Sequence, residues 1–350
     1  MKILFTHELF PPDVVGGGEK LTLKMIHLLR ERGHEIKVLT SGDPAIKEYD
    51  GIRTIRIPKN RYLMNLEFKK VLEEAAGVDI IQTSSGNMAL PSWKAARKLK
   101  IPICCHIHHI FGSYWRDVRG PILGPFFQLG EKIILTKPYD AIVFQNYNSK
   151  NIGLKIGIDE KRIHMVQPGI DWEKYQMKIK KEPFVLFVGS FNMDKPQTKI
   201  KGLNYLLNVA RKLPYINFLI VGGGREIDKM KMHFEKNIIF TGPLVGKTLI
   251  EIYNRALIFC LPSLTEGFGI SLLEAMASGC ATISTVDIGQ EGPKIQPKDT
   301  DQLIRSIKYL IENENVAKEI GNKNRKIARK FTWERFIENY LKIYESISQN

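Results

Sequence analysis

The stretch Leu261–Cys280 reads LPSLTEGFGISLLEAMASGC and carries the densest pattern in the chain. It begins at the end of an apolar run, Ala256 to Leu261, that is typical of a buried strand. Polar residues and two glycines, Gly267 and Gly269, then predict a loop, and the spacing of the apolar residues that follow predicts a helix. A second strand-like run follows at Ala281 to Ser284. The stretch therefore predicts a β-loop-α-β unit of an α/β fold.

Two carboxylates flank this loop. Glu266 and Glu274 are separated by seven residues, and Glu274 falls about one turn into the predicted helix. Backbone N–H groups at a helix start favour an anion, and glycines allow a ligand to approach the backbone closely. Because carboxylates accept hydrogen bonds from sugar hydroxyls, a ligand with a ribose, a diphosphate and a hexose would use both acids and the amides between them. Taken singly, each glutamate also fits a solvated surface position.

The segment from Glu266 through Ala277 resembles the E-x7-E signature of the retaining family 4 glycosyltransferases, and the resemblance extends over nearly the whole chain. It implies an α/β GT-B fold, in which two doubly wound Rossmann-like domains face a central cleft. It also implies that Glu274 binds the nucleotide ribose. Glu266 would contact the donor sugar as a catalytic residue, together with the donor-binding amides of Gly267, Phe268, Gly269 and Ile270.

Three further parts of the resemblance name candidate residues. Gly17 and Gly18 lie between the first predicted strand and a helix, where phosphates can approach helix-start amides. Lys201, in a Lys-Gly pair that opens a helix, matches the family lysine that neutralises the donor diphosphate. His108, after a strand that follows Ile101-Pro102, matches a histidine beside the donor sugar, as a second catalytic candidate.

The chain departs from the family pattern after its sixth predicted strand. The family usually has Gly-Arg there, whereas this chain reads Gly189-Ser190 and continues into a long loop. One cation expected at the phosphates is thus missing, and Lys195 or Lys199 is a candidate substitute. A shortened segment after Asp287 leaves the preference for a nucleotide base open.

Alternating strand and helix patterns run through both halves of the chain and predict two parallel sheets. The strand-like runs are residues 2–6, 35–40, 79–83, 102–107 and 140–145, and then 184–188, 217–221, 238–240, 257–259 and 281–284. We expect an N-terminal acceptor-side domain at 1–171, a linker at 172–182, and a C-terminal domain that binds the nucleotide sugar at 183–330. A last helix at 331–350 would cross back to the first domain, as the resemblance implies.

Composition limits the partners of the chain. The 52 Lys and Arg residues exceed the 37 Asp and Glu residues and give a net charge of +15. A polyanion is therefore an expected partner, and since no nucleic-acid motif occurs, an anionic membrane surface fits better than nucleic acid. Four cysteines without C-x-x-C spacing, together with no signal peptide or long apolar segment, favour a cytoplasmic protein, peripheral at the membrane face if it binds lipid.

Two segments are candidates for surface contacts. Between Arg53 and Lys70, six basic residues alternate with apolar and aromatic ones, which fits either a bilayer-binding surface or an ordinary amphipathic helix. The second segment, Phe111 to Leu135, mixes aromatic residues with Gly and Pro and is a candidate acceptor-side loop.

No cofactor or essential metal is expected. His106, His108 and His109 are close in sequence, but residues 106 and 108 of a strand share a face that residue 109 does not, and no acidic residue is placed nearby. Asp299-Thr300-Asp301 resembles a D-x-D metal motif, yet it directly precedes a predicted helix and fits an N-cap. The run Gly242–Thr248 lacks one residue of the P-loop spacing.

The sequence therefore predicts transfer of a sugar from a nucleotide diphosphate donor to a hydroxyl of a glycan or a lipid-linked acceptor, with retention implied by the resemblance. Two alternatives stay open. An epimerase of the same fold would convert the sugar nucleotide without an acceptor, and a non-catalytic protein would keep the fold and bind a polyanion or a membrane.

Overall fold

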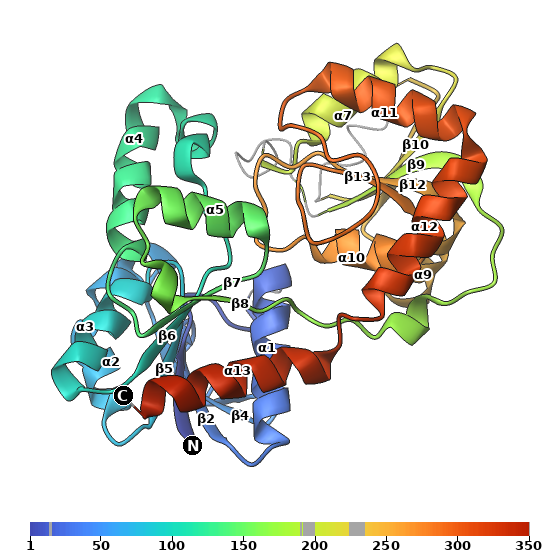
Figure 1. Ribbon diagram of the computed structural model, residues 1–350. Coiled ribbons are helices and arrows are strands. Elements are labelled where there is room, and N and C mark those ends of the chain that lie inside the picture. The colour runs from blue at the N-terminus through green and yellow to red at the C-terminus, as the bar shows by residue number, and fades with distance from the viewer. Residues whose placement is uncertain (14–15, 190, 192–199, 224–234, 350) are drawn as a thin grey trace. The chain divides into compact units, whose positions relative to one another are not determined.

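A computed structural model describes every residue except 14–15, 190, 192–199, 224–234 and 350 (Figure 1). The chain divides into two compact units. The first contains Met1–Gly112, Leu129–Pro168 and Glu334–Asn350, and the second contains Ser113–Gln128 and Gly169–Trp333. The sequence placed residues 113–128 in the first domain, whereas here they group with the second unit.

The first unit alternates strands and helices around one sheet. Its strands are β1 (Lys2–Thr6), β2 (Glu35–Ser41), β3 (Glu48–Tyr49), β4 (Ile52–Ile57), β5 (Ile80–Ser84), β6 (Ile103–His106), β7 (Ala141–Phe144) and β8 (Ile163–Met165). Its helices are α1 (Gly17–Arg30), α2 (Phe68–Ala75), α3 (Ala89–Leu99), α5 (Tyr147–Ile156) and α13 (Trp333–Ser348), with short 3-10 helices η1 (Arg61–Leu66), η2 (Gly112–Tyr114) and η3 (Glu160–Arg162). The helix α4 (Trp115–Leu135) contributes its second part, from Leu129.

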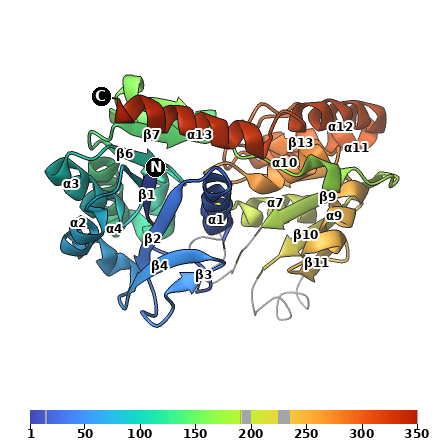
Figure 2. The same cartoon turned by 90° about the horizontal axis from the view of Figure 1, so that it is seen from below.

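The sheet of this unit has the order β3-β4-β2-β1-β5-β6-β7-β8, and every pair is parallel except β3 with β4. Side chains of a strand alternate between two faces, and this separates the covering helices. Leu4, Ile81 and Ile103 share a buried cluster with residues of α2 and α3. Gln82 and His106 point to the other face, where α13 contacts them (Figure 2). The sheet is thus covered on both faces.

The second unit repeats this plan with a smaller sheet, in the order β11-β10-β9-β12-β13, and all its pairs are parallel. The strands are β9 (Glu182–Gly189), β10 (Asn217–Gly222), β11 (Ile238–Gly242), β12 (Ala256–Leu261) and β13 (Ala281–Ser284). The helices are η4 (Trp172–Tyr175), α7 (Leu203–Lys212), α9 (Gly246–Arg255), α10 (Ile270–Ala277), α11 (Thr300–Glu312) and α12 (Glu314–Ala328). One buried cluster joins α7 and α11 to one face, and another joins α9 and α10 to the opposite face.

Two doubly wound parallel α/β units confirm the predicted fold class. All ten strand-like runs of the sequence correspond to strands, with small differences at their ends. Three strands were missed, namely β3, β4 and β8. In the parts of the chain that the structure describes, none of the helices has the length and apolar character needed to cross a membrane.

Candidate donor-binding residues in the two units

The loop between β12 and α10 is the segment that the sequence singled out, and all of its residues from Pro262 to Gly269 are buried. Gly269 has φ +92° and directly precedes α10, a backbone conformation that favours glycine. Phe268 is buried and its ring lies 6.0 Å from that of Phe331. Backbone N–H groups at the start of a helix have no partner within the helix, so this loop and the first turn of α10 can bind an anion.

Glu266 lies in this loop with only 8% of its surface exposed. Its carboxylate accepts a hydrogen bond from Lys201 Nζ at 2.6 Å and from Ser263 Oγ at 3.0 Å. A buried carboxylate needs such partners, because removing its charge from water is costly. The structure therefore joins two residues that the sequence had proposed separately, Lys201 and Glu266.

Backbone contacts hold the Lys-Gly pair against this loop. Gly202 has φ +68°, and a Cβ there would overlap the backbone carbonyl of Pro262. Beside it, the N–H of Leu264 donates to the carbonyl of Ile200 at 2.6 Å. Only glycine combines this φ with such a close approach, so Gly202 is what allows Lys201 to reach Glu266.

Glu274 lies one turn into α10 and is partly buried. Tyr175 donates its hydroxyl to one carboxylate oxygen at 2.9 Å, and Tyr253 donates to the other at 2.8 Å. Burial, and secondly the charge of Glu274, raise the pKa of both phenols, which remain hydrogen-bond donors. Neither tyrosine was predicted, since Tyr175 is 99 residues away in the chain and only the fold brings it to Glu274.

The first unit brings together Gly18 and His108. Gly17 is the first residue of α1. The residue before it, Gly16, donates a backbone hydrogen bond to the Glu19 carboxylate at 3.0 Å. A Cβ on Gly18 would lie 3.4 Å from His108 Nδ1, so the imidazole packs directly against the first turn of the helix. His108 follows β6, as predicted, and places a ring beside helix-start amides of the kind that bind phosphates.

Three imidazoles surround this point. The ring of His106 stacks on that of His108 with 4.4 Å between centroids, and His7 Nε2 lies 3.2 Å from His108 Nε2. On its other side, His106 Nδ1 is hydrogen-bonded to the hydroxyl of Tyr340 in α13. Burial lowers the pKa of His106 to about 4 and, with neighbouring imidazoles as a lesser cause, the pKa of His108 well below its usual range. His7 was not singled out from the sequence.

The sequence contains two groups that could suggest metal ligands, the clustered histidines and Asp299-Thr300-Asp301. Among the residues that the structure describes, no group of three His, Cys, Asp or Glu side chains is arranged to hold a metal ion. Asp299 is the N-cap of α11 and accepts the N–H of Gln302 at 2.8 Å, which confirms the structural interpretation of the Asp-Thr-Asp run. All four cysteines are free and buried.

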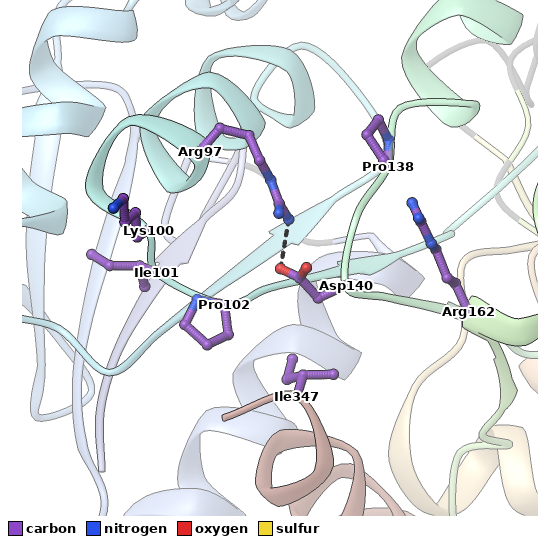
Figure 3. A pocket seen from close by; sticks show the side chains of 8 residues that line it. All are labelled: Arg97, Lys100, Ile101, Pro102, Pro138, Asp140, Arg162 and Ile347. Carbon is purple, nitrogen blue, oxygen red and sulfur yellow. Dashed lines mark hydrogen bonds and ion pairs between the residues drawn. The ribbon is translucent and has the colours of Figure 1, made fainter. Parts of the chain in front are cut away.

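A pocket of about 410 Å³ in the first unit lies apart from these residues (Figure 3). Its wall includes Pro102, just before β6, and Asp140, just before β7, so it is at the amino ends of these strands. Ligands of parallel α/β sheets bind at the carboxyl ends. Inside the pocket, Arg97 donates a hydrogen bond to Asp140 at 2.6 Å. None of the site residues predicted from the sequence lines the pocket. The lining residues are Arg97, Lys100, Ile101, Pro102, Pro138, Asp140, Arg162 and Ile347.

The basic segment between Arg53 and Lys70 does not form a single amphipathic helix. It is divided among β4, η1 and α2. Arg56 is buried, where it pairs with Asp13 at 2.8 Å and donates to the carbonyl of Pro11, and Arg61 pairs with Glu8. Both guanidinium groups have partners within the unit, and the buried one of Arg56 requires such carboxylate and carbonyl partners.

The departure from the family pattern at Ser190 lies outside the described residues, as do Lys195 and Lys199. Gly189, the last residue of β9, is described and pairs in register with Gly222 of β10. That Lys195 or Lys199 takes the role of the missing arginine at the phosphates therefore stays a prediction.

Two family profiles match this chain in succession. "Glycosyltransferase Family 4" matches residues 15–174, and "Glycosyl transferases group 1" matches residues 182–313. The chain belongs to the family 4 glycosyltransferases, with the GT-B fold. The E-x7-E motif, from Glu266 to Glu274, lies in the second of these two matched segments.

Two curated relatives and one solved structure align with this glycosyltransferase over almost their full length. The phosphatidyl-myo-inositol mannosyltransferase of Mycolicibacterium smegmatis is 24% identical, with 96% of this chain and 92% of the relative covered. The O-antigen chain mannosyltransferase C of Escherichia coli is 27% identical, with both chains fully covered. Among solved structures, HepE of Anabaena in complex with UDP-glucose has a TM-score of 0.72 at 18% identity, with 100% of both chains covered.

Proposed function

We propose that this glycosyltransferase moves a sugar from a nucleotide diphosphate sugar to a hydroxyl of a glycan or a lipid-linked acceptor, with retention at the anomeric carbon. The observation that carries the proposal is the contact of Lys201 with Glu266 at the start of α10. A cation, a buried carboxylate and helix-start amides meet there, which suits a ligand with both a diphosphate and sugar hydroxyls.

The proposed catalysis is positional and electrostatic. Lys201 and the amides of the loop would stabilise the negative charge that grows on the leaving diphosphate, and Glu266 would orient the donor sugar. Glu274 would bind the ribose, and the two tyrosine hydroxyls that its oxygens accept would hold the carboxylate in position for that contact. Gly17, Gly18 and His108 would contact the donor from the first unit. Family membership implies a front-face reaction without a covalent enzyme intermediate or an essential metal.

Names of relatives support the classes of donor and acceptor. HepE was solved with UDP-glucose, and the two mannosyltransferases act, by name, on a phosphatidyl-inositol lipid and on an O-antigen chain. A nucleotide-activated hexose and a lipid or glycan hydroxyl are therefore the substrates we propose. Four free, buried thiols suit a reducing compartment such as the cytoplasm.

We also propose that α4 contacts an anionic membrane surface. Ile122, Phe126, Leu129 and Ile133 are spaced by four, three and four residues and thus share one helix face. Their exposed fractions are 77%, 69%, 57% and 47%, which is unusual for four neighbouring large apolar side chains. We call this set the α4 apolar stripe.

Charge supports a lipid surface as the partner of the α4 apolar stripe. The two acidic residues of the helix are engaged: Asp117 pairs with Lys298 at 2.8 Å, and Glu131 accepts the N–H groups of Phe111 and Gly112 at 2.9 and 2.7 Å. Lys132 is exposed in the same helical segment as the stripe, and Arg116 is exposed before the kink that α4 makes at Gly120. Basic and apolar side chains on one exposed helix are typical of interfacial membrane binding.

The donor proposal is tested by thermal denaturation with UDP-, GDP-, ADP- and dTDP-sugars. A ligand at 100 times its Kd stabilises the folded state by about 2.7 kcal/mol. We expect one sugar nucleotide to raise the midpoint, and Glu274→Ala to abolish the shift. Tyr309→Phe, at an exposed position of α11, is the control that should keep it. No shift with any of these sugars would contradict the proposal.

A further inference from the structure

The contact between His7 and His108 determines which nitrogen of each ring carries a proton. His7 Nδ1 lies 2.6 Å from the carbonyl oxygen of Leu9. A carbonyl oxygen only accepts, so this Nδ1 must carry the hydrogen. The N–H of Leu9 is also near the same nitrogen, but at 3.3 Å, and is the weaker contact.

A neutral His7 then has a lone pair on Nε2. Burial lowers the pKa of His7 below its usual value although Glu19 and the hydrogen bond to the Leu9 carbonyl oppose it, and Arg61 lowers it further, so the ring is neutral near pH 8. His108 Nε2 is 3.2 Å from this lone pair and must therefore donate. His108 is neutral as well, since burial and the nearby imidazoles lower its pKa. Its remaining nitrogen, Nδ1, is consequently an acceptor.

The acceptor nitrogen lies beside the start of α1. His108 Nδ1 is the ring atom that a Cβ on Gly18 would meet first, at 3.4 Å, beside the first turn of α1. His108 is partly exposed, whereas His7 and His106 are buried. Stacking on His106 and the hydrogen bond to His7 fix the plane of the ring. A ligand at the start of α1 would thus meet a lone pair and not an N–H group.

We propose that His7 is a positioning residue that holds His108 as its Nε2–H tautomer, so that His108 Nδ1 accepts a hydrogen bond from a hydroxyl of the donor sugar. The inference rests on the proposed function for the identity of that ligand. The inference also predicts which sugars the enzyme prefers. A donor sugar with a hydroxyl next to His108 Nδ1 is selected over a sugar with a carboxylate there or with no oxygen there, because neither of these can donate a hydrogen bond to Nδ1.

The tautomer is measured directly by NMR of the full chain labelled with ¹⁵N-histidine at pH 8. The ring nitrogens of His108 are assigned by the loss of their signals in His108→Asn. We expect protonated Nε2 and unprotonated Nδ1 in the wild type and in His7→Gln, whose side-chain oxygen also accepts. In His7→Phe, which keeps a ring but has no acceptor, we expect His108 to shift toward the Nδ1–H tautomer.

Two outcomes would overturn the inference at this stage. One is an Nδ1–H tautomer of His108 in the wild type, and the other is a His108 spectrum that does not change in His7→Phe. Both are read without any ligand, so they stand even if the proposed function fails. Thermal midpoints of the two His7 variants show whether each is folded, and His7→Gln alone already tests whether an acceptor at position 7 suffices.

The contact with the sugar is tested by adding UDP-glucose or GDP-mannose, with UDP or GDP alone as the matched control. We expect the chemical shift of His108 Nδ1 to change when a sugar nucleotide binds and to remain unchanged when the nucleotide alone binds. With the donor that binds, kcat in His7→Phe should fall about tenfold with little change of KM, while His7→Gln stays within about twofold of the wild type. A bound sugar nucleotide that leaves the resonance unmoved would overturn the sugar contact, whereas no binding of either would count against the proposed function.

Discussion

At the scale of single residues, the ion pair between Lys201 and Glu266 is a buried carboxylate held by a partly exposed lysine. Removing only the lysine takes this charged partner away from a buried carboxylate, so Lys201→Met should lower the free energy of unfolding by about 1–2 kcal/mol. The double variant Lys201→Met/Glu266→Gln should recover part of this loss, because it also removes the negative charge from the buried side chain. Urea unfolding of the two single variants and the double variant measures the coupling, and purely additive losses would show that the pair does not act as a unit.

His106 provides a pH dependence at the same scale. Its pKa of about 4 in the folded protein is below the usual 6.5, so the unfolded chain binds more protons between these values. The contribution of His106 to the free energy of unfolding is therefore complete above pH 6.5 and decreases as the pH falls toward 4. At pH 5 the loss is about 2 kcal/mol. His7 and His108 face this ring, and their lowered pKa values add to the same trend.

Urea unfolding of the wild type between pH 8 and pH 5 measures this loss, with His106→Gln as the comparison. The variant should lose less stability than the wild type over this range, since it lacks the His106 imidazole, whose pKa is lowered in the folded protein. Parallel curves for the two proteins would contradict the assignment of the pH dependence to His106.

At the scale of the element, two glycines with similar backbone conformations make a matched pair. Gly202 before α7 has φ +68°, and Gly246 at the start of α9 has φ +60°. A Cβ at Gly246 meets nothing within 4 Å, whereas a Cβ at Gly202 would overlap the carbonyl of Pro262. Gly246→Ala should thus cost about 1 kcal/mol from backbone strain alone, and Gly202→Ala more than 2 kcal/mol.

Gly202→Ala should also weaken binding of the sugar nucleotide, because the shift that relieves the overlap would move Lys201 away from Glu266. Thermal unfolding with and without the donor separates the two effects for each variant. Equal destabilisation by the two substitutions would mean that strain alone matters and that the contact with Pro262 can relax.

Local patterns were enough to predict those elements whose signals lie within one stretch of sequence. The strand, loop and helix from Ala256 to Ala277 are of this kind, with turn glycines and a helical apolar spacing in place. The strand β4 was missed because its buried Arg56 reads as a solvated charge, and the partner of that charge, Asp13, is 43 residues away. For the same reason, only the structure showed that two tyrosines donate hydrogen bonds to Glu274 and that His7 contacts His108.

At the scale of the whole molecule, a net charge of +15 and the α4 apolar stripe make separable contributions to membrane binding. Electrostatic attraction to anionic lipid is screened by salt, with a Debye length of about 10 Å at 0.1 M, whereas burial of apolar side chains is not. The protein should therefore sediment with phosphatidylglycerol vesicles at low salt and bind phosphatidylcholine vesicles weakly. Raising the salt should leave only the apolar contribution.

The double variant Ile122→Ser/Phe126→Ser isolates that apolar contribution. These side chains are 77% and 69% exposed, so the substitutions should leave the thermal midpoint almost unchanged. Because both lie on the face of the α4 apolar stripe, vesicle binding should fall by tenfold or more, about 1.4 kcal/mol, at every salt concentration. Tyr215→Ser, which changes an exposed aromatic residue of the second unit, is the control that should bind like the wild type. If all three proteins bind anionic vesicles equally and binding disappears with salt, the general positive charge accounts for the attraction and the stripe does not contact lipid.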